Sequence, residues 1–81
     1  MITSAQIRAA RAALRMPSQE LAARSGIAQR TIKRLEAMDG VPASHVSTLV
    51  ALKTALEAAG VEFVGSPEDR PGIRVLVTGR S

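Results

Sequence analysis

The sequence lacks several residue types on which particular kinds of site depend. It contains no cysteine, which excludes disulfide bonds and thiolate metal sites. Its one histidine, His45, leaves no histidine metal cluster and no histidine-based catalytic triad. Tryptophan and tyrosine are absent and Phe63 is the only aromatic residue, which argues against binding modes that stack nucleobases on aromatic platforms. Any binding surface must therefore be built from charged, polar and aliphatic side chains.

Long apolar runs and catalytic groupings are also missing from the sequence. No apolar run approaches the roughly 18–20 residues that a membrane-spanning helix needs. The first residues, MITSAQIRAAR, lack the charged-then-apolar order of a secretion signal, so we expect a cytoplasmic protein without a membrane partner. No nucleophile–base pair, carboxylate pair or phosphate-binding glycine loop stands out. We therefore expect neither enzymatic activity nor a metal or other cofactor.

The positive charge is concentrated in the first half of the chain. The 81 residues carry a net charge of +4 and predict a single folding unit with a modest core. Residues 1–38 hold seven of the eleven Lys and Arg side chains but only two of the seven acidic ones. A basic balance alone is also compatible with solubility or with a membrane surface. Its confinement to one half favours a nucleic-acid partner if a binding motif lies there.

Helical periodicity and capping signals predict three helices in that half, over residues 4–15, 18–25 and 28–37. The first is preceded by Thr3, which forms a capping box with Gln6. Ile2 and Ile7 have the spacing of the accompanying hydrophobic staple. The second begins near Pro17 and ends at a glycine, which is the usual order of helix start and stop signals.

A fourth helix is predicted over residues 44–59, after a turn at residues 38–42. Ser44 is expected to cap this helix and Gly60 to end it, with Pro42 as an alternative first-turn residue. Its expected apolar stripe, with one polar interruption at Lys53, consists of Val46, Leu49, Val50, Leu52 and Leu56.

After Gly60 the periodicity changes and predicts two strands, residues 61–64 and 73–77, joined by a turn over 65–72. An antiparallel hairpin of these strands would have one apolar face made of Val61, Phe63, Ile73, Val75 and Val77. A two-stranded hairpin is marginal in water, so it must pack on a helix or on another chain. Two alternatives remain: the hairpin folds back on the helix at 44–59, or it forms the contact of a homodimer.

The segment PSQELAARSGIAQRTIKRLE, residues 17–36, reads as two short helices joined by a tight turn. Gly26 stands where the turn needs a residue that tolerates positive φ. Four aliphatic residues have the spacing that would lock the two helices together: Leu21, Ile27, Ile32 and Leu35. At 100° per residue, Arg30, Lys33 and Arg34 face away from Ile32 and Leu35. A helix that is apolar behind and cationic in front fits the DNA major groove.

The run LAARSG followed by IAQRTIKRLEA resembles the helix-turn-helix of the Cro and phage-repressor (XRE) family without a gap. The resemblance covers residues 4–59, about two-thirds of the chain, and several constrained positions agree together. It implies a mainly α, repressor-like bundle of four to five helices as a DNA-binding domain over 1–60. Residues 61–81 would form a C-terminal β-hairpin or strand extension. The implied function is sequence-specific binding of double-stranded DNA by a bacterial transcriptional regulator, a repressor type that acts as a homodimer.

The resemblance also implies roles for particular residues. It puts base contacts at Gln29, Arg30 and Arg34, and the chemistry suits adenine for Gln and guanine for Arg. Thr31 would reach phosphate or base, Lys33 would contact phosphate, and the second helix would meet DNA through its first residues, Ser18 and Gln19.

Two further positions have an implied structural meaning. Arg11 and Glu36 match an ion pair that links the first helix to the end of the recognition helix. Ser18 stands where the family usually has Gln, and its shorter side chain is expected to reach only the DNA backbone. Pro17 and Ala28 stand where the family usually has hydroxyl caps.

A second function class stays open beside transcriptional regulation. Antitoxins of toxin–antitoxin pairs often use this type of domain. In that alternative the chain would bind operator DNA through the helix-turn-helix and a toxin protein through residues 61–81.

Overall fold

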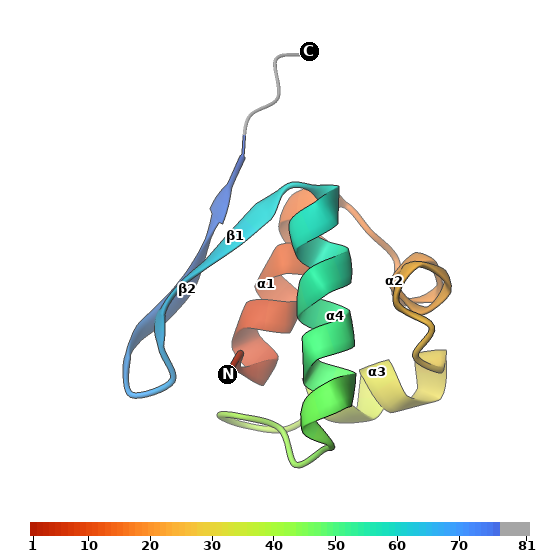
Figure 1. The fold of residues 1–81 in the computed structure, drawn as a ribbon, viewed down its shortest axis with the longest axis horizontal. Coiled ribbons are helices and arrows are strands. Elements are labelled where there is room, and N and C mark those ends of the chain that lie inside the picture. Colours follow the sequence, from red (N-terminus) through yellow and green to blue (C-terminus); the bar gives the residue numbers. More distant parts are fainter. Residues whose placement is uncertain (77–81) are drawn as a thin grey trace.

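The chain forms four helices followed by an antiparallel hairpin, as seen in a computed structural model that describes residues 1–76 (Figure 1). The prediction of a mainly α fold with a C-terminal hairpin is confirmed. Val77 and the residues after it lie outside the described part of the chain. Within residues 1–76, the longest helix is too short to cross a membrane. The elements are α1 (Ser4–Leu14), α2 (Ser18–Ser25), α3 (Gln29–Glu36), α4 (Val46–Ala59), β1 (Val61–Ser66) and β2 (Asp69–Val75).

The start of α1 has the predicted capping box. The backbone N–H of Gln6 donates to Thr3 Oγ1 over 3.1 Å, and the backbone N–H of Thr3 donates to Gln6 Oε1 over 2.8 Å. Ile2 and Ile7 are both buried, as the hydrophobic staple requires. These contacts satisfy two backbone donors that a helix start would otherwise leave without partners.

The start of α4 differs from the prediction. The helix begins at Val46 with His45 as its N-cap residue, so the predictions of Ser44 as the cap and of Pro42 as an alternative first-turn residue were wrong. Val46 and Val50 are also 62% and 52% exposed, although they were expected in the apolar stripe. The buried face is instead completed by Ala55. The position of Val50 is about 100° around the helix from that of Leu49, which turns it away from the core.

The core is built from one face of every helix and from the start of β1. The side chains that α1 and α2 contribute to the core are short or branched aliphatic ones, and those of α4 are mostly leucine. The buried apolar residues are Ile2, Ile7, Ala10, Met16, Leu21, Ile32, Leu35, Leu49, Leu52, Ala55, Leu56 and Val61.

The hairpin folds back onto its own helices, with β2 packed along α1 and β1 beside α4 (Figure 1). Val61 lies opposite Val75 and Phe63 opposite Ile73, which puts all four on one face as predicted. The turn is shorter than the predicted 65–72, because pairing extends to Ser66 and Asp69 and leaves only two residues between the strands.

Gly65 makes this short turn possible. It has a φ of +77° beside an irregularity in the strand register. A Cβ atom on Gly65 would lie 2.2 Å from the carbonyl oxygen of Arg70, closer than real Cβ contacts come. Only glycine therefore permits the bulge that lets the strands continue toward the turn.

One side chain joins the start of α1 to the hairpin. Besides its capping contact, Gln6 donates from Nε2 to the carbonyl oxygens of Val64 over 3.2 Å and Gly72 over 2.7 Å. Gln6 is buried, and the hydrogen bonds that it donates to the hairpin are partly buried. A single amide thus fixes the hairpin to the N-terminal end of α1.

We expect Gln6→Glu to lower the free energy of unfolding by about 1–3 kcal/mol, because a carboxylate keeps the capping acceptor but cannot donate to the two carbonyl oxygens. Urea denaturation followed by circular dichroism measures this loss. Gln19→Glu is the matched control, because Gln19 is exposed in the first turn of α2, where the helix dipole favours a new carboxylate equally. Equal unfolding free energies for the two variants would contradict the role given to Gln6.

Candidate nucleic-acid interface

The helices α2 and α3 are two eight-residue helices joined by a tight turn. Gly26 ends α2 with a φ of +76°, and its N–H donates to the carbonyl oxygen of Ala22 over 2.9 Å. The N–H of Ile27 donates to Ser25 Oγ over 3.1 Å, which further fixes the turn. Leu21 of α2 and Ile32 of α3 are fully buried. The two helices are therefore held together by the apolar residues that the spacing predicted, and Gly26 has the predicted conformation.

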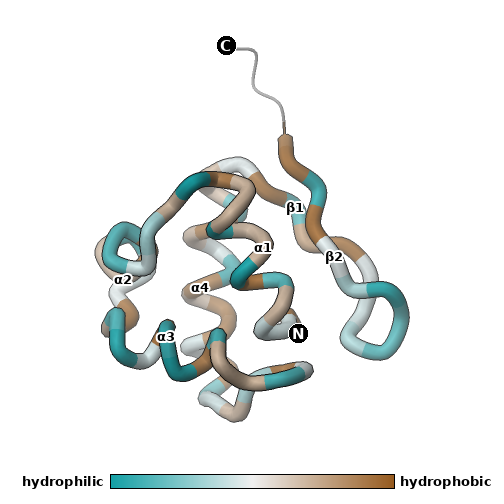
Figure 2. Tube along the Cα trace, turned by 180° about the vertical axis from the view of Figure 1, so that it is seen from behind, coloured by the Kyte–Doolittle hydropathy of each residue, from teal (hydrophilic) through white to brown (hydrophobic). Residues whose placement is uncertain are grey.

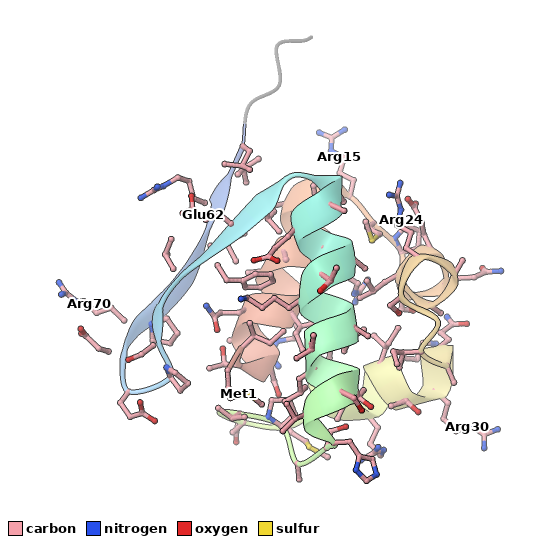
Figure 3. All side chains as sticks on the ribbon, viewed as in Figure 1. Met1, Arg15, Arg24, Arg30, Glu62 and Arg70 are labelled. Atoms are coloured by element: carbon pink, nitrogen blue, oxygen red, sulfur yellow. The ribbon has the colours of Figure 1, made fainter. Side chains whose placement is uncertain are left out.

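The two faces of α3 differ sharply in character. Ile32, Leu35 and Glu36 are buried, whereas Arg30, Lys33 and Arg34 are exposed. Figure 2 shows that α3 is made mostly of hydrophilic residues. Arg30 extends away from the body of the protein at the start of the helix (Figure 3). The outer face of α3 is thus a cationic surface on a helix whose inner face is fixed in the core.

Within residues 1–76, no acidic side chain forms an ion pair with the cations of α3. Residues 1–76 form five ion pairs, and none of the five includes Arg30, Lys33 or Arg34. By contrast, Arg24 on the neighbouring helix pairs with Glu20 over 2.8 Å. Three unneutralised charges within five residues attract an anionic ligand to this face.

Three side chains of α1 contact the carboxyl end of α3: Ser4, Arg8 and Arg11. Ser4 Oγ donates to the carbonyl oxygen of Leu35 over 2.7 Å. The Arg8 guanidinium donates to the carbonyl oxygen of Glu36. Helix ends leave such carbonyl groups without intrahelical partners. Arg8 supplies a donor to Glu36, and Ser4 adds a second donor to the carbonyl oxygen of Leu35, which also accepts from the backbone N–H of Met38 over 3.2 Å. Ser4 and Arg8 were not predicted from the sequence, although their spacing with Arg11 puts all three on one face of α1 and offered a signal.

The ion pair that the resemblance implies is present between Arg11 and Glu36. Nε and Nη2 of Arg11 donate to the two carboxylate oxygens, each over 2.6 Å, and Nη1 donates to the carbonyl oxygen of Met16 over 2.9 Å. The side chains are only 24% and 10% exposed, so the pair is partly shielded from water. Arg11 therefore connects α1 to the end of α3 through a two-point contact, and to the segment between α1 and α2 through Met16.

The pKa of Arg11 is raised above its ordinary value, chiefly by the hydrogen bonds to Glu36, although burial acts in the opposite direction. A raised pKa means that Arg11 stabilises the fold fully below its unfolded-state pKa and loses this contribution only as pH rises through the folded-state pKa. That window lies above the range in which proteins are usually studied. The arginine side of the pair therefore stays charged at any working pH.

The first residues of α2 and α3 meet across the turn. Gln29 Nε2 donates to Ser18 Oγ over 3.0 Å, and Ser18 is buried while Gln29 is half-buried. Thr31 is also half-buried, and Gln19 is exposed at the start of α2. From the sequence, Ser18 was expected to contact only the DNA backbone. Its contact with Gln29 was not predicted, because it depends on the tertiary arrangement.

The predicted DNA-contacting residues therefore lie on two adjoining elements. Ser18 and Gln19 open α2, and the other five lie on α3 within residues 29–34. In comparisons with known proteins, no family model matches this sequence, and no curated protein gives a significant match.

Glu36→Gln is expected to lower the free energy of unfolding by about 2–4 kcal/mol, because it leaves the charge of Arg11 partly buried without a carboxylate. Glu20→Gln breaks an exposed pair of similar length and is expected to cost less than about 1 kcal/mol. Thermal and urea denaturation of both variants give the comparison. If Glu36→Gln lowers the free energy of unfolding no more than Glu20→Gln does, the Arg11–Glu36 pair stabilises the fold no more than an exposed surface ion pair.

Proposed function

We propose that this protein binds double-stranded DNA sequence-specifically and acts as a bacterial transcriptional regulator of the Cro and phage-repressor (XRE) type. In this proposal α3 enters the major groove. The observation that carries it is the outer face of α3, where Arg30, Lys33 and Arg34 are exposed and have no acidic partner among the described residues, on a helix whose inner face is buried in the core. Flexible surface charges would not need such a fixed support.

The side-chain chemistry of this face suits base readout. Arg30 and Arg34 can each donate two hydrogen bonds to guanine O6 and N7, and Gln29 can pair with adenine N6 and N7. Lys33 lacks the planar fork of arginine and suits a phosphate, as does the hydroxyl of Thr31. The proposal therefore separates residues that choose the sequence from residues that hold the backbone.

Useful specificity requires two such modules, because one recognition helix reads only a few base pairs. We propose that a second copy supplies the other module through β2. Gly60 and Leu76 form a backbone hydrogen bond of 2.8 Å in the hairpin register, so the alternation of antiparallel pairs turns the N–H and C=O groups of Ile73 and Val75 away from β1. Among residues 1–76 these groups have no backbone partner.

Exposed apolar side chains lie along the same strand end. Val75 is 47% exposed and Leu76 is 45% exposed. An unpaired strand edge with apolar side chains is a template for another strand, and a twofold axis would cover both edges at once. Such a dimer would present its two α3 helices to half-sites roughly 34 Å apart on one side of the duplex.

Arg30→Ala and Arg34→Ala are each expected to relax base preference and to weaken binding to cognate duplexes by about 1–3 kcal/mol, because each arginine would lose its guanine contact. Lys33→Ala should instead weaken all duplexes evenly and flatten the dependence of affinity on salt. Fluorescence anisotropy with duplexes enriched from a random library, at several salt concentrations, measures both effects. Equal losses on every sequence for the two arginine variants would show that they contact only the backbone.

Val75→Lys is expected to convert a dimer into a monomer, because a charge on the exposed strand end opposes pairing with its symmetry mate. Light scattering over a range of concentrations measures the mass. Val50→Lys is the matched control, since Val50 is similarly exposed on α4 and should leave the dimer mass unchanged. A wild-type chain that stays monomeric at all concentrations would contradict the dimer and would leave the β2 surface to another partner, such as the toxin of the antitoxin alternative.

A further inference from the structure

The part of β2 that a second strand can join is short. Ile73 and Val75 turn their backbone N–H and C=O groups away from β1, and within the described part of the chain these groups have no backbone partner. Toward the turn, Pro71 has no N–H to donate, and Arg70 has a φ of +51° beside the irregularity in the strand register. Regular pairing with another strand is therefore confined to β2 from Gly72 onward.

A second copy whose β2 runs antiparallel about a twofold axis can bring these open residues together in three ways. If Ile73 faces Ile73 of the second copy, Val75 falls opposite Pro71 and a hydrogen bond is lost. If Val75 faces Val75 of the second copy, Arg74 falls opposite Leu76, so that a charged side chain lies against an apolar one. If Ile73 faces Val75 of the second copy, every open N–H and C=O group of both residues is paired.

The third register also matches the side chains on both faces of the sheet. On the face toward the helices, the half-exposed Val75 lies beside Ile73 of the second copy, so apolar surface covers apolar surface. On the outer face, Leu76 falls opposite Gly72. A Cβ atom on Gly72 would lie 3.7 Å from Cγ2 of Val64, its neighbour on β1. The missing side chain thus leaves room beside Val64 for the leucine of the second copy.

The same register puts Arg74 on the twofold axis. Arg74 pairs with Glu62 over 3.1 Å on the outer face, and both side chains are exposed. Two arginines facing each other would repel, but the two Glu62 carboxylates flank them, so the row of four charges is neutral. We propose that β2 binds β2 of a second copy in this register, and that Glu62 and Arg74 of both copies form one charge cluster across the axis. This proposal rests on the proposed dimer and specifies how the two copies recognise each other.

The helix beside β2 leaves room for this pairing. Because β2 packs along α1, joining two β2 strands also brings two α1 helices close together. Ala9 and Ala13 follow Gln6 by three and seven positions, so they lie toward the side of α1 from which Gln6 reaches the hairpin, and both are exposed. Packed helices lie about 8–10 Å apart, depending on the side chains between them. Alanines permit the near end of that range, where longer side chains would collide.

The test is a charge exchange between two variant chains. Arg74→Glu puts four carboxylates in the row and Glu62→Lys puts four cations there, so each variant alone should dimerise about 10-fold more weakly than the wild type. Mixed in equal amounts, the two should form a mixed dimer at least as tight as the wild-type dimer, because cations of one copy then face carboxylates of the other. Native mass spectrometry separates the mixed dimer from the others by mass. The matched control is Lys53→Glu, which reverses a charge in the exposed pair with Glu57 on α4 and should leave dimerisation unchanged.

Cysteine cross-linking tests the register without adding a charge, and so also covers a charge variant that folds poorly. The chain has no cysteine of its own. Residues directly opposite each other in an antiparallel pair have Cα atoms about 4.5–5.5 Å apart, within the reach of a disulfide. Under mild oxidation, Arg74→Cys should therefore form cross-linked dimers faster than Val75→Cys, whose two copies are offset along the strands in this register.

Two results would overturn the register while the wild-type protein still dimerises. One is a mixture of Arg74→Glu and Glu62→Lys that dimerises no more tightly than either variant alone. The other is faster cross-linking through Val75→Cys than through Arg74→Cys. A wild-type chain that stays monomeric at all concentrations would overturn the proposed dimer itself, and selection of duplexes from a random library tests DNA binding separately.

Discussion

The hydrogen bonds from α1 to the carboxyl end of α3 are the constraint on which the rest of the structure depends. Arg11 donates to both carboxylate oxygens of Glu36, and Ser4 and Arg8 donate to carbonyl groups at the end of the helix. Because α3 has only eight residues, its own hydrogen bonds cannot fix its direction. Contacts along one face of α1 do so, and they leave the cationic face of α3 exposed in a fixed orientation.

The hairpin is fixed to the same helix by different chemistry. Gln6 reaches the carbonyl oxygens of both strands from the first turn of α1, while Val61 is buried in the helical core. The helix α1 thus supports α3 on one side and β2 on the other. If β2 carries the dimer contact, the spacing of two recognition helices in a dimer depends on one rigid element in each subunit. The helix α1 therefore links the proposed DNA-contacting helix, α3, to β2, the proposed contact with the second copy of the chain.

Local signals in the sequence predicted much of the fold. The capping box of Thr3 and Gln6 and the positive φ at Gly26 depend on neighbours within a few residues, and both were predicted correctly.

Contacts between distant segments were harder to predict from the sequence. The exposure of Val46 and Val50 depends on which face of α4 meets the core, and periodicity alone misjudged it. The Gln6 contacts with the hairpin and the Ser18–Gln29 hydrogen bond join segments that only folding brings together. At the candidate site, residue types and spacing indicated the cationic face of α3, whereas its support by Ser4 and Arg8 required the structure.

A map of the protein surface that DNA contacts tests most directly whether α3 is the recognition helix. Backbone and side-chain amide shifts, recorded by NMR during titration with a duplex enriched from a random library, give this map residue by residue. We expect the largest changes at Gln29, Arg30, Lys33 and Arg34 and at the start of α2, with little change at the hairpin turn. Changes concentrated on α4 or on the hairpin, with α3 unaffected, would contradict the assignment of α3 as the recognition helix.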